Sequence, residues 1–145
     1  MSTIHLRQRI PSIAPVLLLL FLGLTGCESG DGRFSIQGNV QFDGTPVEEG
    51  KILFLPSDET LSQAVSEISS GSYSIGESSG VFEGNYKVQI YAYRGTGEII
   101  DLGPLYGNEK REKREQFLPE KFNLNSELTV SISQEKHNYD FDLKE

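Results

Sequence analysis

The sequence predicts an all-β domain, an antiparallel sandwich of seven short strands. Two observations predict it. Short segments alternate apolar and polar side chains, which is the pattern of a strand with one face in a core. Residues that favour turns, chiefly Gly, Asp, Ser and Pro, separate these segments. Short antiparallel strands of this kind pack as two layers around one core.

The first predicted strand runs from Phe34 to Phe42. Its apolar residues share one face with Gly38, so the glycine marks either a bulge or a close neighbour. Asp43-Gly44 then gives a turn signal. The second strand, Lys51–Leu55, is apolar on both faces, which predicts a central place in the sheet, and Pro56 ends it.

Five further segments complete the sandwich. They are 64–68, 73–75, 86–93, 128–133 and 138–143. Ser70-Gly71, between the first two, predicts a hairpin. The clearest of the five is 86–93, in which apolar residues alternate strictly with polar residues and tyrosines.

A long insert, 95–125, follows the clearest strand. A connection of this length inside a compact domain is usually functional, partly helical or mobile. Its charge run at 107–122 pairs Glu109 with Lys113 and Arg111 with Glu115 at a spacing of four residues, which would support a short surface helix. We expect a solvated connection here, with a partner-binding helix as the alternative.

Residues 1–26 have the layout of a secretory signal. Arg7 and Arg9 precede an apolar run, Val16–Leu24, that is shorter than the ~20 residues needed to span a membrane. The run ends in Leu-Thr-Gly-Cys, which resembles the bacterial lipobox. This resemblance implies cleavage after Gly26, a diacylglycerol on the sulfur of Cys27, and an acyl chain such as palmitate on the new amino terminus.

Cys27 is the only cysteine in the sequence, so no intrachain disulfide can form. A lone cysteine is often a buried core thiol. Here its place between a signal and a polar, glycine-rich stretch favours lipid attachment over a buried or nucleophilic thiol. The predicted organisation is a signal peptide at 1–26, a lipidated terminus and flexible tether at 27–33, and the β-domain at 34–145.

The charge of the mature chain limits its partners. Cleavage after Gly26 leaves 119 residues with 11 Lys and Arg against 21 Asp and Glu, a formal charge of −10. This balance disfavours nucleic acids and a domain that adheres to anionic headgroups. We therefore expect the lipid to hold the protein on a bacterial membrane, on its periplasmic or cell-surface side.

Five sequence blocks resemble a protein family. They are IQGNVQFDGTPVEEGKILFLP, GSYSI, GVFEGNYKVQIYAYRGTGE, LPEKFNLNSELTVSI and NYDFDL. In content and order they resemble the small carboxypeptidase-regulatory-like, or transthyretin-like, lipoproteins of planctomycete-type bacteria. The resemblance covers nearly the whole mature chain and implies a seven-stranded, prealbumin-like Greek-key sandwich. One departure is that Val81-Phe82-Glu83-Gly84 replaces the family's glycine-proline turn.

One short motif resembles an enzyme. Tyr93-Arg94-Gly95-Thr96 is similar to the Tyr-Arg-Gly-Ser tail of transthyretin-like enzymes that hydrolyse 5-hydroxyisourate. In those enzymes the motif closes the chain and works with several histidines. Here it lies in mid-chain, and His137 is the only histidine after the signal. We expect no catalytic residue and no cofactor besides the covalent lipid.

Two patterns raise the prospect of a binding site. Asp140 and Asp142 share a strand face, but calcium needs six to eight oxygens around one point, so we expect a solvated surface and no metal site. Tyr91 and Tyr93 share the outer face of their strand. We expect the insert to cover them, with a platform for a sugar ring, near Arg94, as the alternative.

These observations combine into one expected function. The chain is expected to be a lipid-anchored, non-enzymatic module of the cell envelope with a structural or protein-interaction role. The alternative is a carbohydrate- or peptide-binding domain that uses Tyr91, Tyr93 and Arg94, and a transthyretin-like hydrolase comes third. The expected partners are the membrane, through the lipid, and a protein or glycan of unknown identity.

Overall fold

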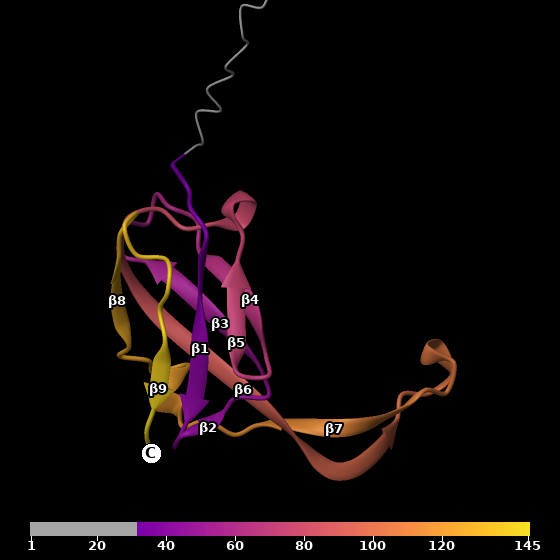
Figure 1. Cartoon of the computed structure of the whole chain (residues 1–145). Coiled ribbons are helices and arrows are strands. Elements are labelled where there is room, and N and C mark those ends of the chain that lie inside the picture. The colour runs from indigo at the N-terminus through magenta and orange to yellow at the C-terminus, as the bar shows by residue number, and fades with distance from the viewer. Residues whose placement is uncertain (1–31) are drawn as a thin grey trace, which may run out of the picture.

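The structure, a computed structural model, describes residues 32–145, and this part of the chain is all-β (Figure 1). Its strands are β1 (Ile36–Phe42), β2 (Thr45–Pro46), β3 (Glu49–Pro56), β4 (Ala64–Ser69), β5 (Ser72–Ile75), β6 (Gly84–Asp101), β7 (Lys110–Gln116), β8 (Thr129–Ile132) and β9 (Phe141–Leu143). Three 3₁₀ turns join them: η1 (Glu77–Ser79), η2 (Pro104–Tyr106) and η3 (Glu120–Phe122). Cys27, the signal and most of the tether lie outside the described residues.

The strands form one open sheet in the order β2-β1-β5-β4-β3-β6-β7, with β8 added to β6 and β9 to β1. Every pairing is antiparallel except that of β1 with β9. Strand β6 pairs with β3 along one edge, over Tyr86–Ala92. Its other edge carries β8 at the start of the strand and β7 beyond Tyr93.

The sheet curls until its ends face each other across one core. The ring of Phe54 on β3 lies 5.8 Å from Tyr73 on β5 and 6.2 Å from Phe141 on β9. Alternate residues of β6 point into the same core, from Tyr86 to Ala92, each at most 1% exposed. This arrangement is consistent with the predicted β-sandwich, and the Greek-key order stays a prediction.

All seven expected strands are confirmed. The seven predicted segments correspond to β1, β3, β4, β5, β6, β8 and β9, and β3 lies between β4 and β6, as its two apolar faces predict. The turn signal at Asp43-Gly44 and the hairpin predicted at Ser70-Gly71 are also confirmed. Asp43-Gly44 and Ser70-Gly71 adopt positive φ angles at both residues, the conformation that a two-residue hairpin requires.

Gly38 marks a close neighbour, the second of the two expected roles. A Cβ at this position would collide with the backbone oxygen of Tyr139. The C-terminal segment can therefore lie directly against β1, where the backbone N–H of Tyr139 donates to Gln37 at 2.9 Å. The absence of one side chain thus fixes the parallel pairing of β1 with β9.

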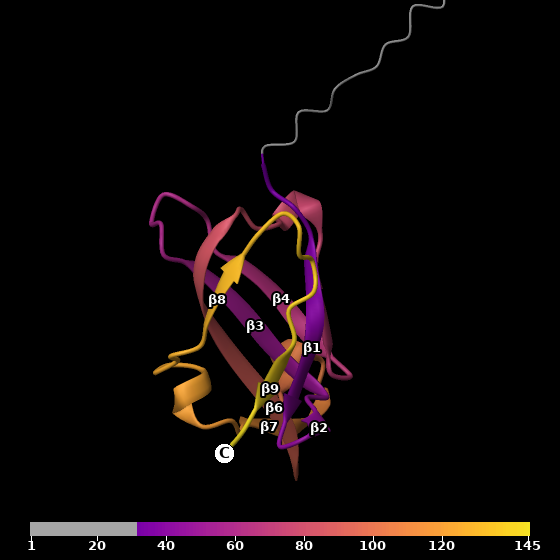
Figure 2. The ribbon, with the colours of Figure 1, turned by 60° about the vertical axis from the view of Figure 1, so that its left-hand side comes forward.

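The domain has two distinct ends. At the near end, where the described chain begins, Phe34 pairs with Val81 and Arg33 lies over the ring of Phe82. At the far end, the rings of Phe42 and Phe117 lie 6.0 Å apart. Strand β6 begins at the near end and crosses the domain (Figures 1 and 2), and at the far end it leaves the body sideways as a projecting hairpin (Figure 1).

The hairpin corrects the expectation for the insert. Residues 110–116, for which we expected a solvated connection with a short surface helix as the alternative, form strand β7 instead. This segment lacks the apolar stripe that would hold a helix on the domain. The N–H and C=O groups beyond Ala92 on β6 offer a ready template, and β7 pairs with them from Gln116 to Lys110.

Candidate functional site: a projecting β-hairpin arm

The main candidate site is the hairpin that extends beyond the far end of the domain, which we call the arm, residues 93–116. It consists of the second half of β6, strand β7 and the connecting loop. Nearly all of its side chains are exposed, and within residues 32–145 no third strand pairs with either of its outer edges. A two-stranded ribbon with both faces in water is marginally stable, so local bonds must hold its shape.

A β-bulge bends the arm in its middle. Pairing shifts between Gly95 and Ile99, where β6 holds more residues than β7. The Glu112 carboxylate accepts the backbone N–H of Gly97 at 2.8 Å, and Gly97 has a φ of 77°. A side chain at Gly95 would collide with that carboxylate. The glycines and Glu112 together specify the bend.

The tip of the arm is an ordered loop that presents apolar side chains to solvent. Turn bonds close it: Tyr106 N–H donates to Gly103, and Leu102 N–H donates to Glu109. Leu105 is nevertheless 95% exposed and Tyr106 66% exposed. The two neighbouring side chains form one apolar patch at the tip, which makes the tip a candidate contact surface.

Charged side chains tie the base of the arm to the domain. Arg94 forms a 2.8 Å ion pair with Glu115, directly opposite on β7, and its guanidinium lies 5.4 Å from the centre of the Phe117 ring. Arg114 forms an ion pair with Glu49 at the start of β3. These contacts hold the root of the arm against the far end.

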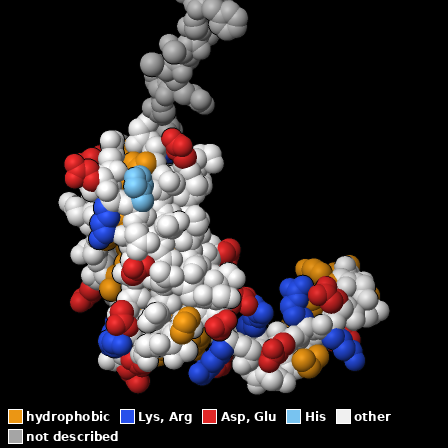
Figure 3. Space-filling model, viewed as in Figure 1, with side chains coloured by type: hydrophobic (Ala, Val, Ile, Leu, Met, Phe, Trp, Pro, Cys, Tyr) orange, Lys and Arg blue, Asp and Glu red, His pale blue; other side chains and the backbone are white. Residues whose placement is uncertain are grey.

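The arm also differs from the rest of the domain in charge (Figure 3). It carries five basic and five acidic side chains, whereas the remainder of residues 32–145 carries 6 basic and 14 acidic ones. Strand β7 alone, KREKREQ, has four basic and two acidic residues. The arm is therefore a neutral element with a basic strand, attached to an acidic body.

The predicted ligand-facing residues meet at the base of the arm. Tyr91 is half-buried on β6, opposite Lys51 of β3, and Tyr93 is 37% exposed, opposite Gln116 of β7. Arg94 is engaged by Glu115. The expected covering of Tyr93 by the insert is wrong, because the first part of the insert projects away from the domain.

The later part of the insert does contribute to the core. Leu118 and Phe122 are buried, and the Asn123 side chain, 2% exposed, donates to the backbone oxygens of Leu118 and Pro119. Neither the arm nor the packing of Leu118 and Phe122 in the core was predicted from the sequence. The available signal was the cluster of turn residues from Gly103 to Asn108, with strand-forming isoleucines before it.

The structure separates the elements of the hydrolase motif. His137 lies at the near end, where its Nδ1 is 2.8 Å from the backbone oxygen of Ser35 and its ring meets the edge of Phe34. Tyr93 and Arg94 lie at the base of the arm, beyond the far end. Because a general base must lie within hydrogen-bond reach of its substrate, these residues do not form one site.

The acidic residues considered for calcium have other roles. Asp140 accepts the Asn39 N–H at 2.7 Å and a bond from the Asn138 side chain at 2.9 Å, and the Asn39 N–H chiefly holds the pKa of Asp140 below its usual value. Asp142 forms an ion pair with Lys144 at 3.0 Å. In residues 32–145 no three His, Cys, Asp or Glu side chains are grouped to hold a metal.

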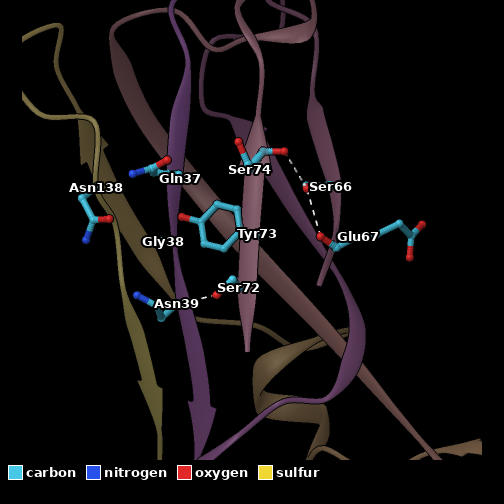
Figure 4. Close-up of a pocket in the computed structure, with 9 residues that line it drawn as sticks. All are labelled: Gln37, Gly38, Asn39, Ser66, Glu67, Ser72, Tyr73, Ser74 and Asn138. Carbon is cyan, nitrogen blue, oxygen red and sulfur yellow. Dashed lines mark hydrogen bonds between the residues drawn. The ribbon is translucent and has the colours of Figure 1, made fainter. Parts of the chain in front are cut away.

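A polar depression of about 440 Å³ lies on the outer face of β1, β5 and β4 (Figure 4). Its lining is rich in amides and hydroxyls: Gln37, Gly38, Asn39, Ser66, Glu67, Ser72, Tyr73, Ser74 and Asn138. Several of these groups bond each other, as Ser72 does with Asn39 at 3.0 Å. The lining offers hydrogen-bonding groups but no exposed aromatic ring on which a sugar would stack.

Two further findings concern the relation of this chain to known proteins and its helices. Comparison with models of known families, with curated proteins and with solved structures gives no match. Within the described residues, no helix has the length and apolar character needed to cross a membrane.

Proposed function

We propose that this chain is a lipid-anchored, non-enzymatic module on the outer side of a bacterial membrane, and that it acts by protein interaction through the arm. The arm is the observation that carries the proposal. Its tip is closed by backbone hydrogen bonds and yet projects Leu105 and Tyr106 into solvent. Burying such side chains against a partner would be favourable at roughly 25 cal/mol per Å² of apolar surface.

The geometry of the domain agrees with an anchor at Cys27. The described chain begins at the near end, and the arm leaves from the far end (Figure 1). Residues 27–33 would reach at most roughly 25 Å when extended. A lipid at Cys27 would thus hold the near end close to the membrane and keep the base of the arm at the opposite end of the domain. The sequence blocks quoted above make membership of the carboxypeptidase-regulatory-like lipoproteins part of this proposal.

The anchor is tested by fractionation of the host's own protein. Cys27→Ala should release the chain from the membrane fraction, and intact mass should show the wild-type protein trimmed after Gly26 and acylated. A Cys27→Ala protein that stays in the membrane fraction contradicts the anchor.

The binding role of the arm is tested separately, by chemical cross-linking in intact cells followed by purification of the tagged full chain. A Leu105→Ser/Tyr106→Ser variant should lose the cross-linked species that wild type gives. The control is Val65→Ser, because Val65 is an exposed apolar residue, 40% accessible, on β4 of the domain body. Equal cross-linking of the tip variant and the control would contradict a binding role for the tip.

The polar depression favours a second candidate, a carbohydrate- or peptide-binding role. Its amide and hydroxyl lining suits a ligand that is rich in hydrogen-bonding groups. The test is binding of the full chain to an array of glycans and cell-wall peptides, with Gln37→Ala as the variant expected to weaken it. An array without hits removes this candidate.

A further inference from the structure

The exposed apolar side chains lie chiefly at the two ends of the arm. Leu105 and Tyr106 are at its tip, Tyr93 and Leu124 lie near its base, and Ile99 lies next to the bulge. A partner that covers both ends must contact the length of β7 as well. The inference below deepens the proposed function, because it names the partner that the arm fits.

The outer edge of β7 has a defined hydrogen-bonding pattern. Phe117 N–H donates to Ala92 of β6, and Glu109 C=O accepts from Leu102. Odd-numbered residues of this segment therefore direct their backbone groups toward β6. In a strand these directions alternate, so the even-numbered residues direct theirs outward. They are Lys110, Glu112, Arg114 and Gln116. This row of donors and acceptors has no partner strand within residues 32–145.

We propose that the outer edge of β7 pairs with β7 of a second copy of this chain, antiparallel, across a two-fold axis at Lys113. The four strands would then form one continuous ribbon in the order β6-β7-β7-β6. In this register Arg111 lies opposite Glu115 of the second copy, and Glu112 lies opposite its Arg114. By symmetry each of these opposite-charge pairs occurs twice.

Backbone geometry and charge together select this register. Opposed residues of antiparallel strands must both direct their backbone groups toward the partner or both away from it, which excludes every register that pairs an odd with an even residue. A shift that centres the axis on Glu112 places Arg111 opposite Lys113 and Lys110 opposite Arg114. A shift to Arg111 or to Arg114 places two arginines face to face, and only an axis at Lys113, the midpoint of β7, pairs all seven of its residues. Centring on Lys113 leaves one like-charge contact, and each Lys113 is already bonded to Glu98 of its own chain at 2.8 Å.

The charges on β7 also account for the selectivity of the edge. Charged edge strands normally prevent pairing between molecules. On β7 two basic residues precede each glutamate, so like charges meet in other registers, while the self-pairing centred on Lys113 sets each glutamate opposite an arginine. An edge with this pattern selects a copy of itself.

The same two-fold axis brings the apolar ends of two arms together. Antiparallel pairing places Lys110 of one copy beside Gln116 of the other. The tip that precedes Lys110, with Leu105 and Tyr106, then approaches the segment that follows Gln116 in the second copy, which includes Leu124. Exposed ion pairs contribute little, so the pairing is weak in dilute solution. Confinement on one membrane, which rests on the proposed anchor, raises the effective concentration.

Site-directed disulfide formation tests this register in the full chain. Lys113→Cys places two thiols at a non-hydrogen-bonded pair, where Cα atoms are about 4.5 Å apart, within disulfide range. Mild oxidation of membranes should convert this variant to a covalent dimer. Lys110→Cys is the matched control on the same strand, because its two copies would lie roughly 20 Å apart and should stay monomeric. The wild-type chain, whose only cysteine is Cys27, shows whether that residue alone forms a dimer on oxidation.

A mixed experiment tests the register independently. Arg111→Cys and Glu115→Cys, carried on two differently tagged copies, should form a disulfide with each other and neither with itself. Failure of both the Lys113→Cys and the mixed cross-link overturns the pairing, as does equal dimer formation by Lys110→Cys. The same oxidation on purified full chain at high concentration tests the pairing even if fractionation rejects the anchor, so the two failures are distinguishable.

Discussion

The Tyr73 hydroxyl donates a 2.7 Å hydrogen bond to the backbone oxygen of Tyr139, above the position where Gly38 has no side chain. The bond joins β5 to the C-terminal segment from inside the core. Tyr73 is 4% exposed, so both bonded groups are out of contact with bulk water. An oxygen that loses such a donor has no solvent to replace it.

Tyr73→Phe should therefore lower the free energy of unfolding by about 1–2 kcal/mol. Urea unfolding of the full chain measures the change. Tyr93→Phe is the matched control, because the Tyr93 side chain is exposed at the base of the arm and its stability effect should be close to zero. Equal losses in the two variants would contradict a specific role for the Tyr73 hydroxyl.

Alkaline pH should destabilise the fold through the same tyrosine. Burial, with the nearby Asp140 charge, raises the pKa of Tyr73 above its ordinary value of 10. The unfolded chain then releases this proton near pH 10 while the folded chain retains it, so stability is complete below pH 10 and falls as the pH rises above it. Tyr73→Phe should flatten this decline above about pH 10. Burial also raises the pKa of Tyr86, so part of the decline should remain.

Gly38→Ala should be one of the most damaging small substitutions in the domain. The added methyl would collide with Tyr139 O, which is backbone and cannot rotate away, so we expect a loss of about 1–3 kcal/mol. Gly76→Ala is the control, since Gly76 has an ordinary φ of −73° and nothing within 4 Å of the added methyl. Thermal unfolding of both variants tests this, and a Gly38→Ala protein as stable as Gly76→Ala would contradict the close packing.

The sequence predicts the body of this fold well because burial there creates a strong pattern. Ile52 and Phe54 on β3, and the alternating residues of β6, point into one core, and that requirement appears directly as apolar periodicity. The two hairpin turns can be predicted from the sequence equally well. Positive φ at both turn residues restricts Asp43-Gly44 and Ser70-Gly71 to the residue types found there.

The arm could not be predicted in the same way, because no core lies beneath it. Charges four residues apart, such as Arg111 and Glu115, stabilise a helix, but Glu115 also lies directly opposite Arg94 when the segment is a strand. The sequence pattern of β7 fits both structures. Its conformation is decided by β6, which is distant in the chain and supplies the pairing edge.

Acid should weaken the junction between β1 and the C-terminal segment. The bond from the Asn39 N–H holds the pKa of Asp140 below its usual value of 3.8, so this carboxylate contributes stability above about pH 4 and loses it as the pH falls through its folded pKa. Asp140→Asn should be less stable than wild type at pH 7 and should lose less stability between pH 4 and 2. Urea unfolding measures both proteins across this pH range. If wild type and Asp140→Asn lost the same free energy of unfolding between pH 4 and 2, this role would be contradicted.

The bend of the arm should respond to substitution without affecting the domain. A methyl on Gly95 would collide with the Glu112 carboxylate, which is the flexible end of a side chain and can swing away, releasing the Gly97 N–H. Gly95→Ala should therefore speed amide hydrogen exchange at Gly97 and along β7, while global stability changes by no more than about 0.5 kcal/mol.

Glu112→Gln tests the same contact without adding a methyl, because a neutral amide accepts the Gly97 N–H more weakly than a carboxylate does. Glu109→Gln is its control, since Glu109 pairs with Arg111 outside the bulge at 3.1 Å. Faster exchange at Gly97 in Glu112→Gln alone would support the assigned contact. If either arm variant unfolded as readily as Gly38→Ala, the arm would have to be part of the cooperative core. Its exposed faces and its single strand pairing argue against that.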